Sequence, residues 1–125
     1  MDSNPNPSGK ATETSTPNSA PAIKVSAVQL YRAYQRNEVS ADSTYKDRLL
    51  EVNGTVESID KNVMDDVVLR LATGDMISNV DATLKSSEES TAGQLEKRQQ
   101  VTLLCKGAGM VIGSPQLNEC TFSSK

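Results

Sequence analysis

The stretch LLEVNGTVES, residues 49–58, decides the fold because apolar and polar residues alternate along its length. A period of two places every second side chain on the same face of a β-strand. The inner face here carries Leu50, Val52, Gly54 and Val56. A glycine on that face predicts a point where the strand coils sharply or where another backbone segment approaches closely. The stretch is therefore predicted to be a half-buried strand.

The sequence predicts five short strands in all, with one helix between the third and the fourth. In SSEESTAGQLEK, residues 86–97, the period changes, which predicts a helix from Ser87 to Leu95. Ser86 and Glu89 match a capping box at its start. The predicted strands are residues 49–59, 67–72, 77–84, 101–105 and 117–122.

Helical patterns precede the first strand. Ser26 begins a capping box ahead of a helix that is predicted over Ala27–Gln35, whose apolar side chains share one face. A second short helical turn is predicted over residues 40–45, with Ser40 or Asp42 as its cap.

The N-terminal segment differs in composition from the rest of the chain. Residues 1–22 are dense in Pro, Ser, Thr and Asn and contain no large apolar residue after Met1. Such a segment cannot offset the entropy of ordering, so it is predicted to be a disordered or extended tether. A cloning tail is the alternative, although such tails rarely vary this much. The folded domain is then residues 23–125.

The order of these elements predicts a mainly β fold. Five short strands with a helix between the third and fourth match the OB-fold, a Greek-key barrel, here with an extra N-terminal helix. A five-stranded α+β sandwich is the alternative that the pattern leaves open.

Composition narrows the classes of function. The chain has 125 residues, a net charge of −3 and no histidine. An acidic balance argues against tight binding to phosphate backbones, which depends on clustered Lys and Arg. Without histidine the chain lacks the commonest general base and the usual zinc ligand. Because no nucleophile is paired with a base, we expect no enzyme, no cofactor and no metal site.

The sequence shows no targeting segment. No stretch approaches the ~18 apolar residues that predict a membrane span. Met1 is followed at once by Asp2, without the basic and apolar regions of a signal peptide. A cytoplasmic protein would have these features, and so would an exported protein without its leader.

Cys105 and Cys120 are the only cysteines of the chain. Antiparallel pairing that sets Cys105 opposite Cys120 also sets Leu103 opposite Phe122. All four side chains then point into the barrel, so this register agrees with the hydrophobic pattern. A disulfide is predicted, and it implies an oxidising compartment. The alternative is a pair of reduced, buried cysteines that pack as small apolar residues.

The stretch LYRAYQRNEVSADSTYKDRLLEVNGTVESI, residues 30–59, together with Cys105 and the Leu-x-x-Cys of residues 117–120, resembles the tRNA_anti-like family. Members are OB-fold domains found largely in bacterial exported proteins and lipoproteins, typically with a cysteine in strand four and Leu-x-x-Cys in strand five. The resemblance covers about residues 28–122. In the first stretch it rests on Leu30, Ala33, Tyr34, Asn37, Glu38, Ala41, Asp42, Tyr45, Lys46, Val52, Gly54, Val56 and Ile59.

This resemblance implies a place in the cell and a ligand. It implies a protein of the bacterial periplasm that is lipid-anchored in its precursor, with Met1 standing where the lipid-bearing cysteine would be. Contact with the membrane would then be through that anchor alone. The family name implies nucleic-acid binding, by analogy with anticodon-binding OB domains.

A ligand is expected on the outer face of the second and third strands. The predicted binding side chains are Arg70, Asn79, Asp81, Thr83 and Lys85. None of them is aromatic, so the stacking platforms typical of single-strand binders are missing. We therefore interpret the chain first as a non-enzymatic module of a cell-envelope protein or lipoprotein that binds protein, peptide or glycan. The alternative is binding of a single strand or a tRNA-like nucleic acid, as the resemblance implies.

Overall fold

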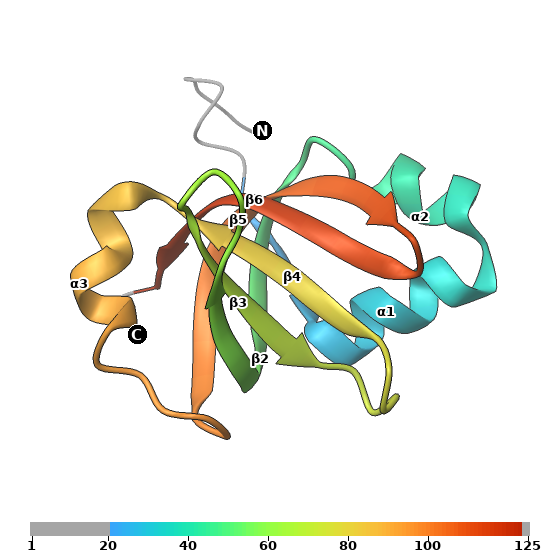
Figure 1. Cartoon of the computed structure of the whole chain (residues 1–125). Coiled ribbons are helices and arrows are strands. Elements are labelled where there is room, and N and C mark those ends of the chain that lie inside the picture. The colour runs from blue at the N-terminus through green and yellow to red at the C-terminus, as the bar shows by residue number, and fades with distance from the viewer. Residues whose placement is uncertain (1–20, 124–125) are drawn as a thin grey trace, which may run out of the picture.

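Five strands of the computed structural model, which describes residues 21–123, close into a barrel (Figure 1). Their order is β2-β3-β4-β6-β5, and β5 pairs again with β2. β4 and β6 run parallel, whereas the other barrel pairs are antiparallel. This is the predicted OB-fold, and closure of the barrel excludes the open sandwich. The strands are β2 (Leu49–Lys61), β3 (Val67–Ala72), β4 (Asn79–Leu84), β5 (Gln100–Val111) and β6 (Ser114–Phe122).

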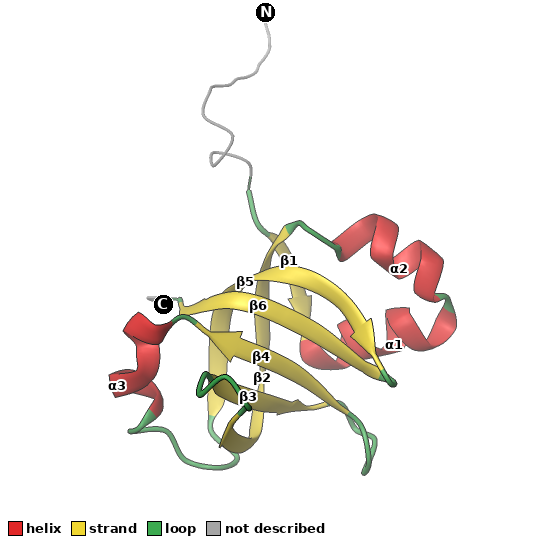
Figure 2. Ribbon diagram, turned by 45° about the horizontal axis from the view of Figure 1, so that its top comes forward, coloured by secondary structure: helices red, strands yellow, loops and turns green. Residues whose placement is uncertain are grey.

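Helices lie at both ends of the barrel (Figure 2). α1 (Ala27–Arg36) and α2 (Glu38–Tyr45) lie at one end. A 3₁₀ turn, η2 (Ser86–Glu88), leads into α3 (Glu89–Ala92) at the other end. Within the described residues, no helix is long and apolar enough to cross a membrane.

The N-terminal cap of α1 is the one predicted from the sequence, whereas the cap of α2 is a different residue. The capping box at Ser26 is confirmed, since its side chain accepts a hydrogen bond from the backbone N–H of Gln29. Asn37 both ends α1 and caps α2, where its side chain accepts from the N–H of Ser40 at 3.1 Å. The prediction of Ser40 or Asp42 as the cap was wrong, because α2 begins two residues earlier than its pattern indicated.

The helix between β4 and β5 is shorter than predicted. It ends at Ala92, and neither η2 nor α3 has a side-chain cap, so the predicted capping box of Ser86 and Glu89 was wrong. The Glu88 carboxylate of this segment makes a tertiary hydrogen bond in place of a helix cap. Glu88 accepts a hydrogen bond from the backbone N–H of Phe122 at 3.2 Å, which ties the segment to the end of β6.

α1 closes one end of the barrel with its apolar face. Ala27, Leu30 and Tyr34 are buried on that face. At Gly54 of β2 the close neighbour is a side chain of α1, because a Cβ added there would lie 3.1 Å from the Cβ of Ala27. Burial and the Asp42 carboxylate, which accepts a hydrogen bond from the Tyr34 hydroxyl at 2.7 Å, raise the pKa of that hydroxyl.

A short strand that the sequence did not predict precedes α1. β1 (Ile23–Ser26) pairs in parallel with residues 50–53 of β2. Four residues are too few for a pattern of alternation to be distinguished from the start of the helix. Nearly all of the predicted tether, residues 1–22, lies outside the described residues.

Cys105 and Cys120 form the predicted disulfide, with their Cα atoms 4.2 Å apart. Leu103 lies opposite Phe122, as the register argument required. The register shifts between Leu104 and Lys106, next to the disulfide. The two C-terminal strands are therefore held together by their hydrogen-bonded ladder and by one covalent bond.

Candidate functional site

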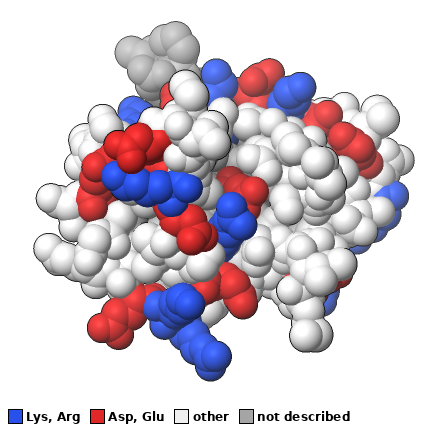
Figure 3. Space-filling view, viewed as in Figure 1, with Lys and Arg blue, Asp and Glu red and all other residues white. Residues whose placement is uncertain are grey.

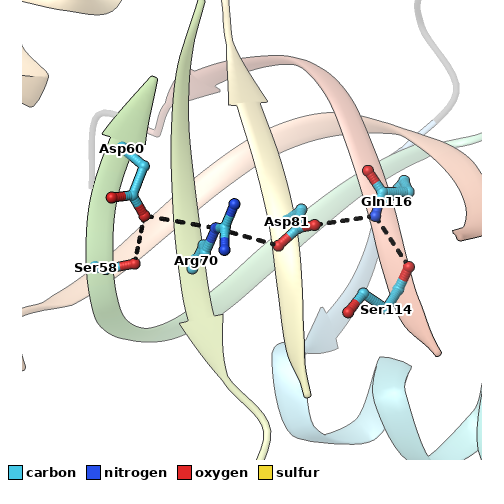
Figure 4. Close-up of polar contacts among 6 residues, drawn as sticks. All are labelled: Ser58, Asp60, Arg70, Asp81, Ser114 and Gln116. Atoms are coloured by element: carbon cyan, nitrogen blue, oxygen red, sulfur yellow. Dashed lines mark hydrogen bonds and ion pairs between the residues drawn. The ribbon is translucent and has the colours of Figure 1, made fainter. Parts of the chain in front are cut away.

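A row of polar side chains crosses four strands on the outer face of the barrel. Strand register places Ser58 of β2 opposite Arg70 of β3, Arg70 opposite Asp81 of β4, and Asp81 opposite Gln116 of β6. Asp60 joins the row from β2 (Figure 4). We call these five residues the polar row.

Hydrogen bonds and ion pairs link the members of the polar row from one end to the other. The Nε of Arg70 lies 3.5 Å from Oδ2 of Asp60 and 3.9 Å from Oδ1 of Asp81. The Ser58 hydroxyl donates to Asp60 at 2.6 Å, and the Gln116 amide donates to Asp81 at 3.1 Å. One guanidinium and two carboxylates give the polar row a net charge of −1.

The contacts of Arg70 position its guanidinium more than they stabilise the fold. Its side chain is 48% exposed, and surface ion pairs contribute about 0–1 kcal/mol. Neither terminal amino group donates a hydrogen bond to a residue in the described part of the chain. The planar donor edge of the guanidinium is therefore available to a ligand on this face.

The structure brings together only some of the predicted binding residues. Arg70 and Asp81 are in contact within the polar row. Thr83 and Lys85 instead line a pocket of about 450 Å³ at the end of β4. Asn79 lies apart, opposite Ala72 at the other end of that strand.

Three members of the polar row were missed in the sequence. A register shift between Val56 and Ser58 changes the phase of β2, so that Ser58 and Asp60 point outward beside Arg70. Strict alternation from Val56 would have turned Ser58 inward. The adjacent polar residues Glu57 and Ser58 are the signal that marks this bulge. Gln116 was missed because β6 begins at Ser114, three residues before the predicted strand.

Basic and acidic side chains interleave on the barrel face seen in Figure 3, and neither colour forms a broad area. At the end of β2, the Lys61 ammonium group donates a hydrogen bond to the Asp65 carboxylate at 3.1 Å, and this bond raises the pKa of the ammonium group. Arg70 is likewise held by two carboxylates. This face therefore offers hydrogen-bonding groups and lacks a continuous cationic track for phosphates.

Solved structures resemble the fold at low sequence identity. A "putative nucleic acid-binding lipoprotein" from Klebsiella pneumoniae subsp. pneumoniae gives a TM-score of 0.66 at 13% identity, covering 82% of this chain and 92% of that one. A "putative aspartyl-tRNA synthetase" from Leishmania major Friedlin gives a TM-score of 0.52 at 12% identity, and the match covers 89% of this chain but 22% of that one. At such identities the likeness shows the fold alone.

The sequence model of the family described as tRNA_anti-like matches residues 2–121. No curated protein matches the chain.

Proposed function

The chain belongs to the tRNA_anti-like family, and from this membership we propose that it is a non-enzymatic module that binds single-stranded nucleic acid. The structural observation that carries the proposal is the polar row, which spans four strands on the face where OB barrels hold extended ligands. A similar fold in a protein described as a nucleic acid-binding lipoprotein adds support. Neither that description nor the family's is enzymatic.

The chemistry of the polar row suits base edges better than phosphates. Unpaired bases expose donors and acceptors that a duplex hides. Arg70 offers the donor pair that matches the O6 and N7 of guanine, and the Asp81 carboxylate accepts from an amino group. The NH2 group of Gln116 donates to Asp81 and to the Ser114 carbonyl, which leaves the amide oxygen of Gln116 as the acceptor for a base. The net charge of −1 repels a phosphate backbone at the same place. Contact through bases on this face is therefore favoured.

The affinity of such a site is expected to be low. Without aromatic stacking, each base forgoes about 1–3 kcal/mol. We expect single-stranded DNA or RNA to bind with a Kd of about 10⁻⁴–10⁻⁶ M at physiological salt.

The first interpretation of the sequence was a module for protein, peptide or glycan. The relatives give that interpretation no support, whereas they support the nucleic-acid alternative. The polar row is compatible with either class of ligand. We therefore rank nucleic acid ahead of protein, peptide or glycan because of the family.

Fluorescence anisotropy with labelled single-stranded oligonucleotides tests the proposal. Arg70→Gln should weaken binding at least about fivefold, which corresponds to about 1 kcal/mol for a lost hydrogen bond. Lys97→Gln removes the same charge from the loop before β5 and serves as the control, with little expected effect. If the anisotropy of the labelled oligonucleotide shows no saturable rise up to about 1 mM unaltered protein, nucleic-acid binding is contradicted.

The intramolecular disulfide and the lipoprotein relative indicate an extracytoplasmic protein. More specifically, we propose the bacterial periplasm, with residues 1–22 as the spacer of a lipid-anchored precursor. The redox state of Cys105 and Cys120 in intact cells is the measurement that bears on this placement, because a cytoplasmic location would leave both thiols free.

A further inference from the structure

A second surface of the molecule, which shares no residue with the polar row, carries three cationic side chains. A groove of about 420 Å³ lies where β1, α1 and the end of α2 meet. We call it the basic groove. Its lining includes Lys24, Gln29, Arg32, Arg36 and Tyr45.

Local structure explains why these cations gather. On α1, Arg32 and Arg36 are four residues apart and therefore lie on the same side of the helix. That side is exposed because the opposite side of α1 is buried against the barrel. Lys24 precedes buried Val25 on β1 and so points outward. β1 ends at Ser26 and α1 begins at the next residue, so Lys24, Arg32 and Arg36 line one groove.

Within the described part of the chain, no ion pair neutralises the charges of the basic groove. No acidic side chain lines it, and among residues 21–123 neither Lys24, Arg32 nor Arg36 forms an ion pair within 4 Å. Glu51 lies opposite Lys24 in the strand register but does not line the groove. The basic groove therefore differs from the polar row, where two carboxylates hold the only arginine.

The lining also contains an aromatic side chain. Tyr45 is half-buried at the end of α2, where it packs against the core and lines the basic groove. Cations that follow a backbone, together with an aromatic ring on which a base stacks, are the two parts that single-strand binding requires.

We propose that the basic groove binds the phosphodiester backbone of a single-stranded nucleic acid. This inference rests on the proposed function and assigns the phosphates to a surface that the polar row does not include. A bilayer surface fits less well, because cationic membrane sites are reinforced by apolar side chains that insert beside the charges. The most exposed apolar side chains lie in loops outside the groove, at Val63, Met76 and Ile112.

The salt dependence of oligonucleotide binding tests this inference. Each phosphate contact on a single strand contributes about 0.7 to the slope of log K against log salt, so three cations predict a slope of about −2. Arg32→Gln with Arg36→Gln should reduce the slope to about −0.7, and Arg32→Lys with Arg36→Lys should restore it. Helix content of each variant, measured by circular dichroism, checks that α1 remains folded.

Two control variants distinguish the basic groove from the remaining charged surface of the domain. Lys61→Gln with Lys97→Gln removes two charges elsewhere and should leave the slope unchanged. Arg70→Gln should weaken binding without changing the slope, since carboxylates already neutralise Arg70.

Each other outcome overturns the inference in a recognisable way. If the variant with Arg32→Gln and Arg36→Gln binds the oligonucleotide with an unchanged salt slope, the phosphates do not lie in the basic groove. The proposed function would then still stand. No oligonucleotide binding by the unaltered protein would overturn both. Binding to vesicles that contain phosphatidylglycerol, without binding to oligonucleotides, would assign the groove to lipid headgroups instead.

Discussion

Reduction of the disulfide between Cys105 and Cys120 is a perturbation that removes no side chain and isolates one bond. The two residues are 15 positions apart, and closing a loop of that size lowers the entropy of the unfolded chain by an amount worth about 3 kcal/mol. Both side chains are fully buried between β5 and β6, so reduction leaves the remaining core contacts nearly intact. We therefore expect the loss of stability to be close to the loop-closure value.

Urea unfolding with and without dithiothreitol measures this loss. With an m-value of about 1–3 kcal/mol/M, a loss of about 3 kcal/mol lowers the midpoint by about 1–3 M. The variant with both Cys105→Ala and Cys120→Ala is the control, and its midpoint should not respond to the reductant. Equal midpoints for oxidised and reduced protein would refute the reasoning. Labelling of the unfolded, unreduced protein should find no free thiol, whereas two free thiols would show that the bond had not formed.

Two further predictions concern the loops and contacts around the barrel. Gly107→Ala should destabilise the domain by about 1–3 kcal/mol, as measured in thermal melts. The reason is that the Cβ of the new alanine would overlap the backbone carbonyl oxygen of Tyr45. No change in stability would mean that the C-terminal end of α2 moves aside freely. The backbone N–H of Ile77 and then the hydroxyl of Tyr31 donate to Asp75 and lower the pKa of its carboxyl below the usual range of an aspartate. A carboxyl whose pKa is lower in the folded than in the unfolded state stabilises the fold when the pH is above the unfolded-state pKa. This stabilisation is lost as the pH falls through the folded-state pKa. Tyr31→Phe should raise this pKa in an NMR titration, and an unchanged value would show that the hydroxyl bond is not formed in solution.

The sequence alone was sufficient where structure depends on local period. Leu50, Val52 and Val56 alternate with polar residues, and such alternation defines an inner face whatever the partner strand is. The register of Cys105 and Cys120 was predictable for a related reason, since the pairing that joins them also places Leu103 in the core and Phe122 against it. The capping box at Ser26 needs only residues within one helical turn. Each of these signals lies within a short stretch or a single strand pair.

Only the tertiary structure decided which polar side chains meet. Asp81 and Gln116 are 35 positions apart and come together because β4 and β6 pair in parallel, a pairing that no local pattern specifies. Ser58 joins Arg70 because a bulge shifts the phase of β2 by one residue. One extra residue reverses every later side chain of a strand, so its effect on a surface cannot be read until the strands are paired.

The basic groove has the same origin. Arg36 and Tyr45 belong to different helices, and Lys24 belongs to a strand that the sequence did not predict. Their shared position follows from the packing of β1 on β2 and of α1 on the end of the barrel. Charge composition is a property of the chain, whereas a charged surface is a property of the fold, because burial of one face of α1 forces its arginines onto the other.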